Sequence, residues 1–152
     1  MHVALRPVDV DDLDAFAHLD AAYAATYALE PVVTRASLAF YARSGHSFAA
    51  GPVAAPVGFV LAHAVWNGAH PTVTVARVVA QDDDALVLRA LVEAVVKSAF
   101  DAAVYDLAID LPAADGAARE ALDAPWRERP VRRFERVLGA RAASAAAPPD
   151  DA

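Results

Sequence analysis

Residues 72 to 111 read TVTVARVVAQDDDALVLRALVEAVVKSAFDAAVYDLAIDL, and this stretch decides the fold. The residues up to Ala80 are mostly β-branched, which predicts a central, well-covered strand. Apolar residues then recur at three- and four-residue steps from Asp84 to about Ala103 and predict an amphipathic helix. Residues 104 to 111 predict a second strand. Two strands joined through a helix are expected to lie side by side and parallel, with a right-handed connection.

Three consecutive acids, Asp82, Asp83 and Asp84, occupy the turn between the first strand and the helix. A helix N-terminus is normally a good place for an anion, because its N–H groups are unpaired and its dipole is positive there. Carboxylates at this turn disfavour a bound phosphate, although they are good helix caps. No glycine occurs between Gly68 and Gly116, so the turn cannot be a glycine-rich phosphate loop.

The length and composition of the chain limit the classes of protein to consider. A chain of 152 residues predicts one domain, which we place at residues 1 to 141, followed by a disordered Ala/Pro/Asp tail at residues 142 to 152. The sequence contains no cysteine, which excludes a disulfide, a thiol nucleophile and a thiolate metal site. We find neither a secretory signal nor an apolar run that could span a bilayer, and therefore expect a cytoplasmic protein with no membrane partner.

The net charge of −7 is unevenly distributed, because residues 119 to 141 hold seven arginines against four acids. Such asymmetry can mark a face that binds anions. A basic domain and an RNA- or DNA-binding motif are both absent from the sequence, so we expect no nucleic-acid partner. We expect the arginines to be mostly exposed, namely Arg127, Arg129, Arg132, Arg133 and Arg136.

The remaining segments predict an α/β sheet with mixed strand directions. Thr34 is a plausible N-cap for a helix that ends near Arg43. The expected order is β-α-α-β-β-β-α-β-α-β. Strands are expected at residues 3–8, 46–50, 57–66, 72–80 and 104–111, with one or two final strands before Gly139. Helices are expected after Asp9, after Thr34, from Asp84, and from Gly116 to Asp123.

This order resembles the GNAT acetyltransferase superfamily over nearly the whole ordered chain. The resemblance is carried by Leu5-Arg6-Pro7, Pro56-Val57-Gly58-Phe59-Val60 and Ala76-Arg77-Val78-Val79. Three shorter motifs resemble an uncharacterised GNAT-like bacterial family, namely residues 42–48 (ARSGHSF), 64–68 (AVWNG) and 95–102 (VVKSAFDA). The resemblance implies a mixed, mostly antiparallel sheet with a central parallel strand pair, which splays near Val78 to Ala80 and opens a cleft.

The resemblance also implies a cofactor and a substrate. The cofactor is acetyl-CoA or another acyl-CoA, and the acceptor is an amine on a small molecule or a peptide. The implied cofactor-binding residues are Val78, Val79, Ala80, Gln81, Leu86 and Arg89. The family's glycine-rich turn, Arg/Gln-x-x-Gly-x-Gly/Ala, is absent, because Asp83, Leu86 and Leu88 stand at its key positions. The family's general-acid tyrosine is also absent, because its place falls at or beside Ala121.

Histidines are the remaining candidates for catalysis, because their pKa lies near neutrality. We select His46 first and His63 second, although a lone histidine on a strand is also a common structural residue. Ser44 and Ser47 flank His46, but no acid is placed to complete a triad. The spacing of histidines and acids shows no cluster that would bind a metal.

Two functions therefore remain open. One is an acyl-CoA-dependent N-acyltransferase with a divergent cofactor turn. The other is a GNAT-fold module without catalysis, which binds another ligand in the cleft or serves as a homodimerisation or partner-binding unit.

Overall fold

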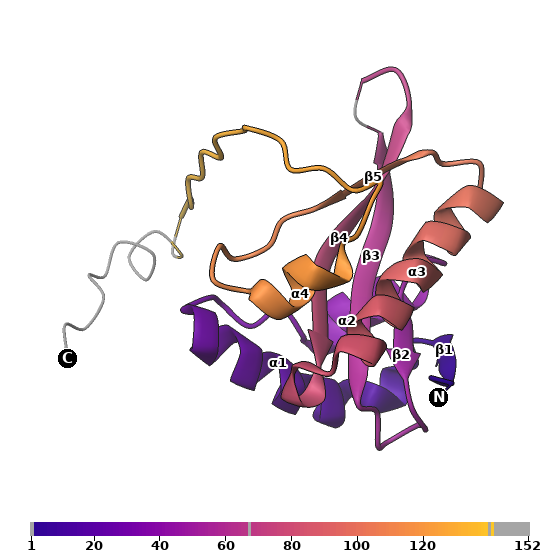
Figure 1. Cartoon of the computed structure of the whole chain (residues 1–152). Coiled ribbons are helices and arrows are strands. Elements are labelled where there is room, and N and C mark those ends of the chain that lie inside the picture. The colour runs from indigo at the N-terminus through magenta and orange to yellow at the C-terminus, as the bar shows by residue number, and fades with distance from the viewer. Residues whose placement is uncertain (1, 67, 140, 142–152) are drawn as a thin grey trace.

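The computed structural model describes residues 2–66, 68–139 and 141 of the chain. In these residues five strands form one sheet, and helices cover both of its faces (Figure 1). The elements in chain order are β1 (Leu5–Pro7), η1 (Val10–Asp12), α1 (Leu13–Tyr27), α2 (Arg35–Ala42), β2 (Phe48–Ala50), β3 (Gly58–Trp66), β4 (Pro71–Ala80), η2 (Gln81–Asp83), α3 (Ala85–Asp101), β5 (Asp106–Ile109) and α4 (Gly116–Ala121).

The sheet keeps the strands in sequence order, β1-β2-β3-β4-β5. The first four strands pair antiparallel, whereas β4 and β5 pair parallel, which confirms the predicted parallel pair. The parallel pairing runs only from Thr72 opposite Asp106 to Val75 opposite Ile109. Beyond Val75, β4 continues to Ala80 without a partner from β5. β5 ends at Ile109, so the pairing stops before the end of β4, where the sequence predicted an opening.

A β-bulge lies at the point where the pairing of β4 with β5 ends. On β3, the neighbouring residues Leu61 and Ala62 pair with Arg77 and Val75 of β4, so Ala76 is an extra residue in β4. Bulges bend a strand, increase its twist and are common beside functional sites. The bulge therefore lies where the pairing of β4 with β5 ends.

Two apolar clusters lie on the two faces of the sheet. The first packs α3 and α4 against one face around Val60, Val73 and Leu91. The second packs α1 and α2 against the other face around Phe16, Leu38, Phe59 and Leu61. The rings of Phe16 and Phe59 stack with their centroids 4.5 Å apart, which fixes α1 on β3. Burial of such side chains contributes roughly 1.5–3 kcal/mol each to folding.

The helices begin where the sequence places acidic or hydroxyl caps. Thr34 accepts a hydrogen bond from the N–H of Ser37 and starts α2, as predicted. Asp84 starts α3 in the same way, and Asp9 caps η1 just before α1. Asp115 starts α4 by accepting from the N–H of Ala118. Each such cap contributes about 1 kcal/mol.

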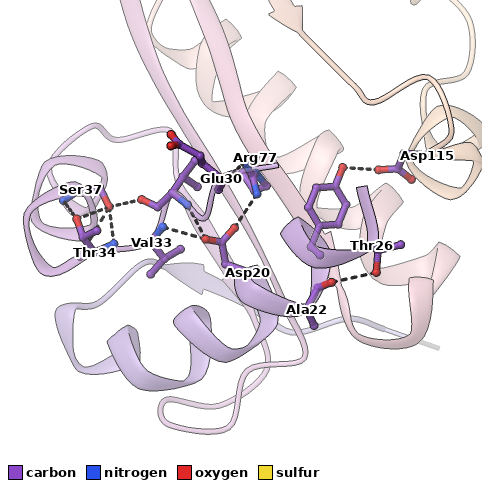
Figure 2. Close-up of polar contacts among 11 residues, drawn as sticks. Asp20, Ala22, Thr26, Glu30, Val33, Thr34, Ser37, Arg77 and Asp115 are labelled. Carbon is purple, nitrogen blue, oxygen red and sulfur yellow. Dashed lines mark hydrogen bonds and ion pairs between the residues drawn. The ribbon is translucent and has the colours of Figure 1, made fainter. Parts of the chain in front are cut away.

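Two buried ion pairs attach α1 and its leading turn to the sheet. Arg6 of β1 donates to both carboxylate oxygens of Asp12 at 2.7 Å. Burial opposes ionisation of Asp12, but hydrogen bonds from Arg6 and from the Asp9 N–H outweigh burial and lower the pKa of its carboxyl. Arg77 of β4 binds Asp20 of α1 at 2.9 Å, and Asp20 also accepts from the N–H groups of Val32 and Val33 (Figure 2).

The prediction of one or two final strands before Gly139 is wrong, because residues 122–139 contain no strand. Pro130 interrupts this segment and cannot donate a ladder hydrogen bond. The segment also has apolar side chains that are largely exposed, namely Val131 (76%), Phe134 (89%) and Leu138 (69%). These side chains are therefore not packed against the sheet. Among the described residues β5 is therefore an edge strand, and the parallel pair is not central. The tail predicted at residues 142 to 152 lies outside the described residues.

Candidate functional site

A cavity of about 730 Å³ lies between α1 and the end of β4. The side of the cavity that α1 provides includes Tyr23 and Tyr27. Its remaining lining comes from the β2–β3 loop, from the last two residues of β4 and from η2. The full lining is Asp14, Ala15, His18, Leu19, Ala22, Tyr23, Thr26, Tyr27, Ala54, Pro56, Val79, Ala80, Gln81, Asp82 and Asp83.

The charged residues that line this cavity are mostly acidic. Asp14, Asp82 and Asp83 contribute carboxylates, whereas no lysine or arginine is among the lining residues. Arg77 lies nearby in β4, but its charge is neutralised by Asp20. A concave site of one sign concentrates ligands of the opposite sign. The cavity therefore favours a cationic ligand over an anionic one.

The acidic turn has two distinct parts. Asp82 and Asp83 adopt left-handed backbone conformations, with φ of 55° and 53°, and line the cavity. Asp84 instead accepts hydrogen bonds from the N–H groups of Leu86 and Val87 at 3.0 and 3.3 Å. These are the first-turn donors of α3 that an external anion would use. The chain's own carboxylate thus occupies the place where a phosphate would bind at this helix.

The predicted cofactor-binding residues are only partly brought together. Val79, Ala80 and Gln81 line the cavity. Val78 is buried in the cluster that includes α3, on the other face of the sheet. Leu86 is exposed in the first turn of α3. The guanidinium of Arg89 is exposed and lies 3.8 Å from the Asp123 carboxylate.

A tyrosine–carboxylate pair, which the sequence did not point to, bridges α1 and α4. The Tyr23 hydroxyl donates to Oδ2 of Asp115 at 2.6 Å, and this carboxylate is only 3% exposed (Figure 2). Burial and the adjacent Asp115 raise the pKa of Tyr23. The guanidinium carbon of Arg77 lies 5.3 Å from the centre of the Tyr23 ring. The only signal in the sequence was Tyr23 on an amphipathic helix and Asp115 before a short one.

The two candidate histidines lie on opposite faces of the sheet and do not line the cavity. Nδ1 of His46 is 2.9 Å from the Ser98 hydroxyl of α3. That hydroxyl donates to the Val95 carbonyl, so His46 donates to Ser98. Burial lowers the pKa of His46. His63 instead packs its ring against Phe40 and Tyr41 of α2.

The environments of these histidines differ in how well their polar atoms are satisfied. Nδ1 of His63 is buried and has no hydrogen-bond partner within the described part of the chain. Beside His46, the Ser47 hydroxyl donates to the Ala62 carbonyl and accepts from the Ala62 N–H. Ser47 therefore joins the start of β2 to β3 and does not serve as an activated nucleophile. The structure thus offers no shared site for His46 and His63.

Within residues 2–66, 68–139 and 141, no group of three or more histidines and acids is arranged to hold a metal ion. In the same residues, no helix combines the length and the apolar character needed to cross a membrane.

A family described as "Protein of unknown function (DUF1999)" matches residues 32–145, which is most of the chain. No curated protein matches the sequence. The crystal structure of wild-type TTHA1254 from Thermus thermophilus is 39% identical to the chain. The match covers 91% of this chain and 99% of that one, with a TM-score of 0.74.

More distant solved structures are acetyltransferases. A ribosomal-protein-alanine N-acetyltransferase from Brucella melitensis biovar Abortus 2308 is 19% identical, with a TM-score of 0.62 over 88% of this chain and all of that one. An aminoglycoside acetyltransferase from an uncultured soil metagenomic sample, in complex with sisomicin, is 14% identical. Its TM-score is 0.67 over 90% of this chain and 97% of that one. At these identities the likeness shows the fold alone, which is the GNAT fold predicted from the sequence.

Proposed function

Because the chain belongs to the DUF1999 family and has the fold of GNAT acetyltransferases, we propose that it is an acyl-CoA-dependent N-acyltransferase. The acceptor is an amine on a small molecule or a peptide. The cofactor turn is divergent, since it carries acids in place of glycines.

The observation that supports this proposal best is the strand edge of β4 that is not paired with β5 beyond Val75. Residues 76 to 80 of β4 pair with no residue of β5, and the bulge at Ala76 marks where the unpaired edge begins. A free strand edge offers N–H and C=O groups to an extended ligand that carries amides. The pantetheine arm of CoA is such a ligand, and it could place its thioester beside the cavity at Val79 and Ala80.

The acid-lined cavity suits the second substrate. A cationic amine is attracted by Asp14, Asp82 and Asp83, which share the cavity wall. After losing a proton, the amine nitrogen attacks the thioester carbonyl, a C–N bond forms and the C–S bond breaks. CoA leaves as a thiolate and takes up a proton. Holding both reactants in line supplies much of the rate in such a reaction.

Two measurements on the purified protein test the function. Acetyl-CoA should raise the melting temperature, because a ligand of the folded state stabilises it by about 2.7 kcal/mol at a hundred times its Kd. Adding spermidine or a lysine-containing peptide should then release free CoA thiol, and omitting either substrate is the control. An unchanged melting temperature together with no thiol release would count against an acyltransferase.

A second function is supported by Asp84. Because this carboxylate occupies the free N–H groups at the start of α3, the helix offers less to a CoA pyrophosphate. The alternative is therefore a GNAT-fold module without catalysis that binds a cationic ligand in the same cavity. In that case spermidine should raise the melting temperature and acetyl-CoA should not.

A further inference from the structure

Three aspartates are buried within the described residues, and they differ in their partners. Asp12 is bound by Arg6 and Asp20 by Arg77, so both negative charges are neutralised. Asp115 is 3% exposed, yet it makes no ion pair with any residue that the structure describes. A buried carboxylate without a cation is costly, and such groups gather at functional sites.

The partners of Asp115 connect it to the cavity. Its Oδ1 accepts from the Ala118 N–H at 3.0 Å, which caps α4. Its Oδ2 accepts from the Tyr23 hydroxyl at 2.6 Å. Tyr23 is one of the residues that line the cavity, whereas Asp115 is not. Tyr23 therefore connects the cavity to the carboxylate, and Tyr27, which also lines the cavity, lies near the same carboxylate.

We propose that Tyr23 and Asp115 form a proton relay that accepts the proton of the acceptor amine, an inference that rests on the proposed acyl transfer. The phenolic oxygen of Tyr23 keeps a lone pair while its proton is donated to Asp115. The cationic amine first loses one proton to water, and the neutral amine then gives a second proton to this oxygen as the tyrosine's own proton moves to Oδ2 of Asp115. The C–N bond forms and the C–S bond breaks. The departing thiolate takes a proton from water, and Asp115 later returns its proton through Tyr23 to solvent.

The surroundings of the pair fit this sequence of transfers. Burial and Asp115 raise the pKa of Tyr23, so no free phenolate accumulates and the two transfers occur together. The other ionisable groups around the pair are Arg77 from β4, Tyr27 from α1 and Asp83 from η2. Arg77 is held by Asp20 and does not neutralise Asp115. Tyr23 is then the catalytic residue, and Asp115 acts through it.

The test uses the full chain with acetyl-CoA and spermidine, followed by thiol release. Tyr23→Phe removes only the hydroxyl, and Asp115→Asn keeps the cap of α4 while losing the ability to take a proton. Each variant should lower kcat about a hundredfold or more, as expected for loss of general-base catalysis. The KM for acetyl-CoA should stay within about twofold of the wild type. Tyr41→Phe is the matched control, since Tyr41 is half-buried in α2 and does not line the cavity.

A second readout separates a relay from a purely structural bridge. Two protons move together in the relay, so kcat in the wild type should fall in D2O, and this isotope effect should diminish in Tyr23→Phe. Full activity in Tyr23→Phe, or an isotope effect that both variants retain, would overturn the relay while the acyl transfer stands. No thiol release by the wild type would overturn the proposed function and the relay with it.

Discussion

At the scale of single residues, Gly58 is the glycine whose surroundings leave least room for a side chain. A Cβ at this residue would lie 2.7 Å from Cγ1 of Val87 and 2.8 Å from the Val79 carbonyl oxygen. The carbonyl belongs to β4 and cannot move without breaking the ladder between β3 and β4. We expect Gly58→Ala to lower the free energy of unfolding by about 1–3 kcal/mol, measured by urea denaturation.

Gly116→Ala is the matched control for Gly58. No atom lies within 4 Å of a Cβ built at Gly116, which is the first residue of α4, and alanine favours a helix. This variant should be as stable as the wild type or slightly more so. Equal midpoints for Gly58→Ala and the wild type would show that β3 can shift to make room.

His46 should make the stability of the protein depend on pH. Burial lowers the pKa of His46 in the folded state, so the unfolded chain takes up a proton first as the pH falls below about 6.5. The histidine's contribution is complete above that pH and is lost as the pH falls toward the lowered pKa. Each unit of lowering is worth about 1.4 kcal/mol.

Urea denaturation at pH 7.5 and at pH 5.5 measures this effect. The wild type should lose more stability between the two pH values than His46→Gln does, because glutamine does not titrate. His70→Gln, at an exposed loop histidine, controls for the loss of one imidazole. The same acid loss in the wild type and in His46→Gln would show that other groups set the pH dependence.

At the scale of elements, we expect the acids of the β4–α3 turn to weaken the binding of a phosphate there. Asp82 and Asp83 line the cavity, whereas Asp84 caps α3. One charge facing another at about 4 Å costs about 1 kcal/mol in water, so two acids oppose a pyrophosphate by about 2 kcal/mol. We therefore expect the double variant Asp82→Asn, Asp83→Asn to bind acetyl-CoA roughly thirtyfold more tightly by titration calorimetry.

Asp84 provides the contrast within the same turn. Asp84→Ala should lower the free energy of unfolding by about 1 kcal/mol through loss of the cap, whereas Asp84→Asn should largely preserve it. Low-micromolar binding of acetyl-CoA to the unmodified protein would mean that the phosphates rest away from Asp82 and Asp83.

The elements that the sequence predicted well are those defined by local signals. The apolar stripe of α3 and its Asp84 cap lie within one stretch of chain, and the structure begins α3 directly after Asp84. The cap of α2 at Thr34 is local in the same sense. The expected last strand failed because strand formation depends on a partner and a packed face, neither of which residues 122–139 obtain in the structure. The apolar residues of this segment alone could not show that it lacks a partner strand and a packed face.

At the scale of the whole molecule, the sequence predicted only the part of the candidate site that lies at the end of β4. Val79, Ala80 and Gln81 were among the implied cofactor-binding residues, and they line the cavity. Tyr23 and Asp115 are 92 residues apart, and no local pattern shows that they meet. Asp115 was recognisable only as a helix cap, a role that it also fulfils.

The charge of the whole molecule leads to a prediction about nucleic acids. The arginines at positions 127, 129, 132, 133 and 136 are exposed, as expected, and Arg133 pairs with Asp110 and Glu135. We expect no binding of single-stranded or duplex DNA at physiological salt, measured by fluorescence anisotropy, because the net charge is −7. Tight binding that weakens steeply with added salt would contradict this.

The separation of Tyr23 and Asp115 along the chain also affects the order in which contacts form during synthesis. During synthesis the chain emerges from its N-terminus, and domains gain stability as their distant contacts form. Arg77 can meet Asp20 once the segment up to Arg77 has emerged, since these two are 57 positions apart. Asp115 emerges much later, and closing the longer loop costs more entropy. We infer that α1 docks on the growing sheet early, and that the Tyr23–Asp115 hydrogen bond forms only when α4 has left the ribosome.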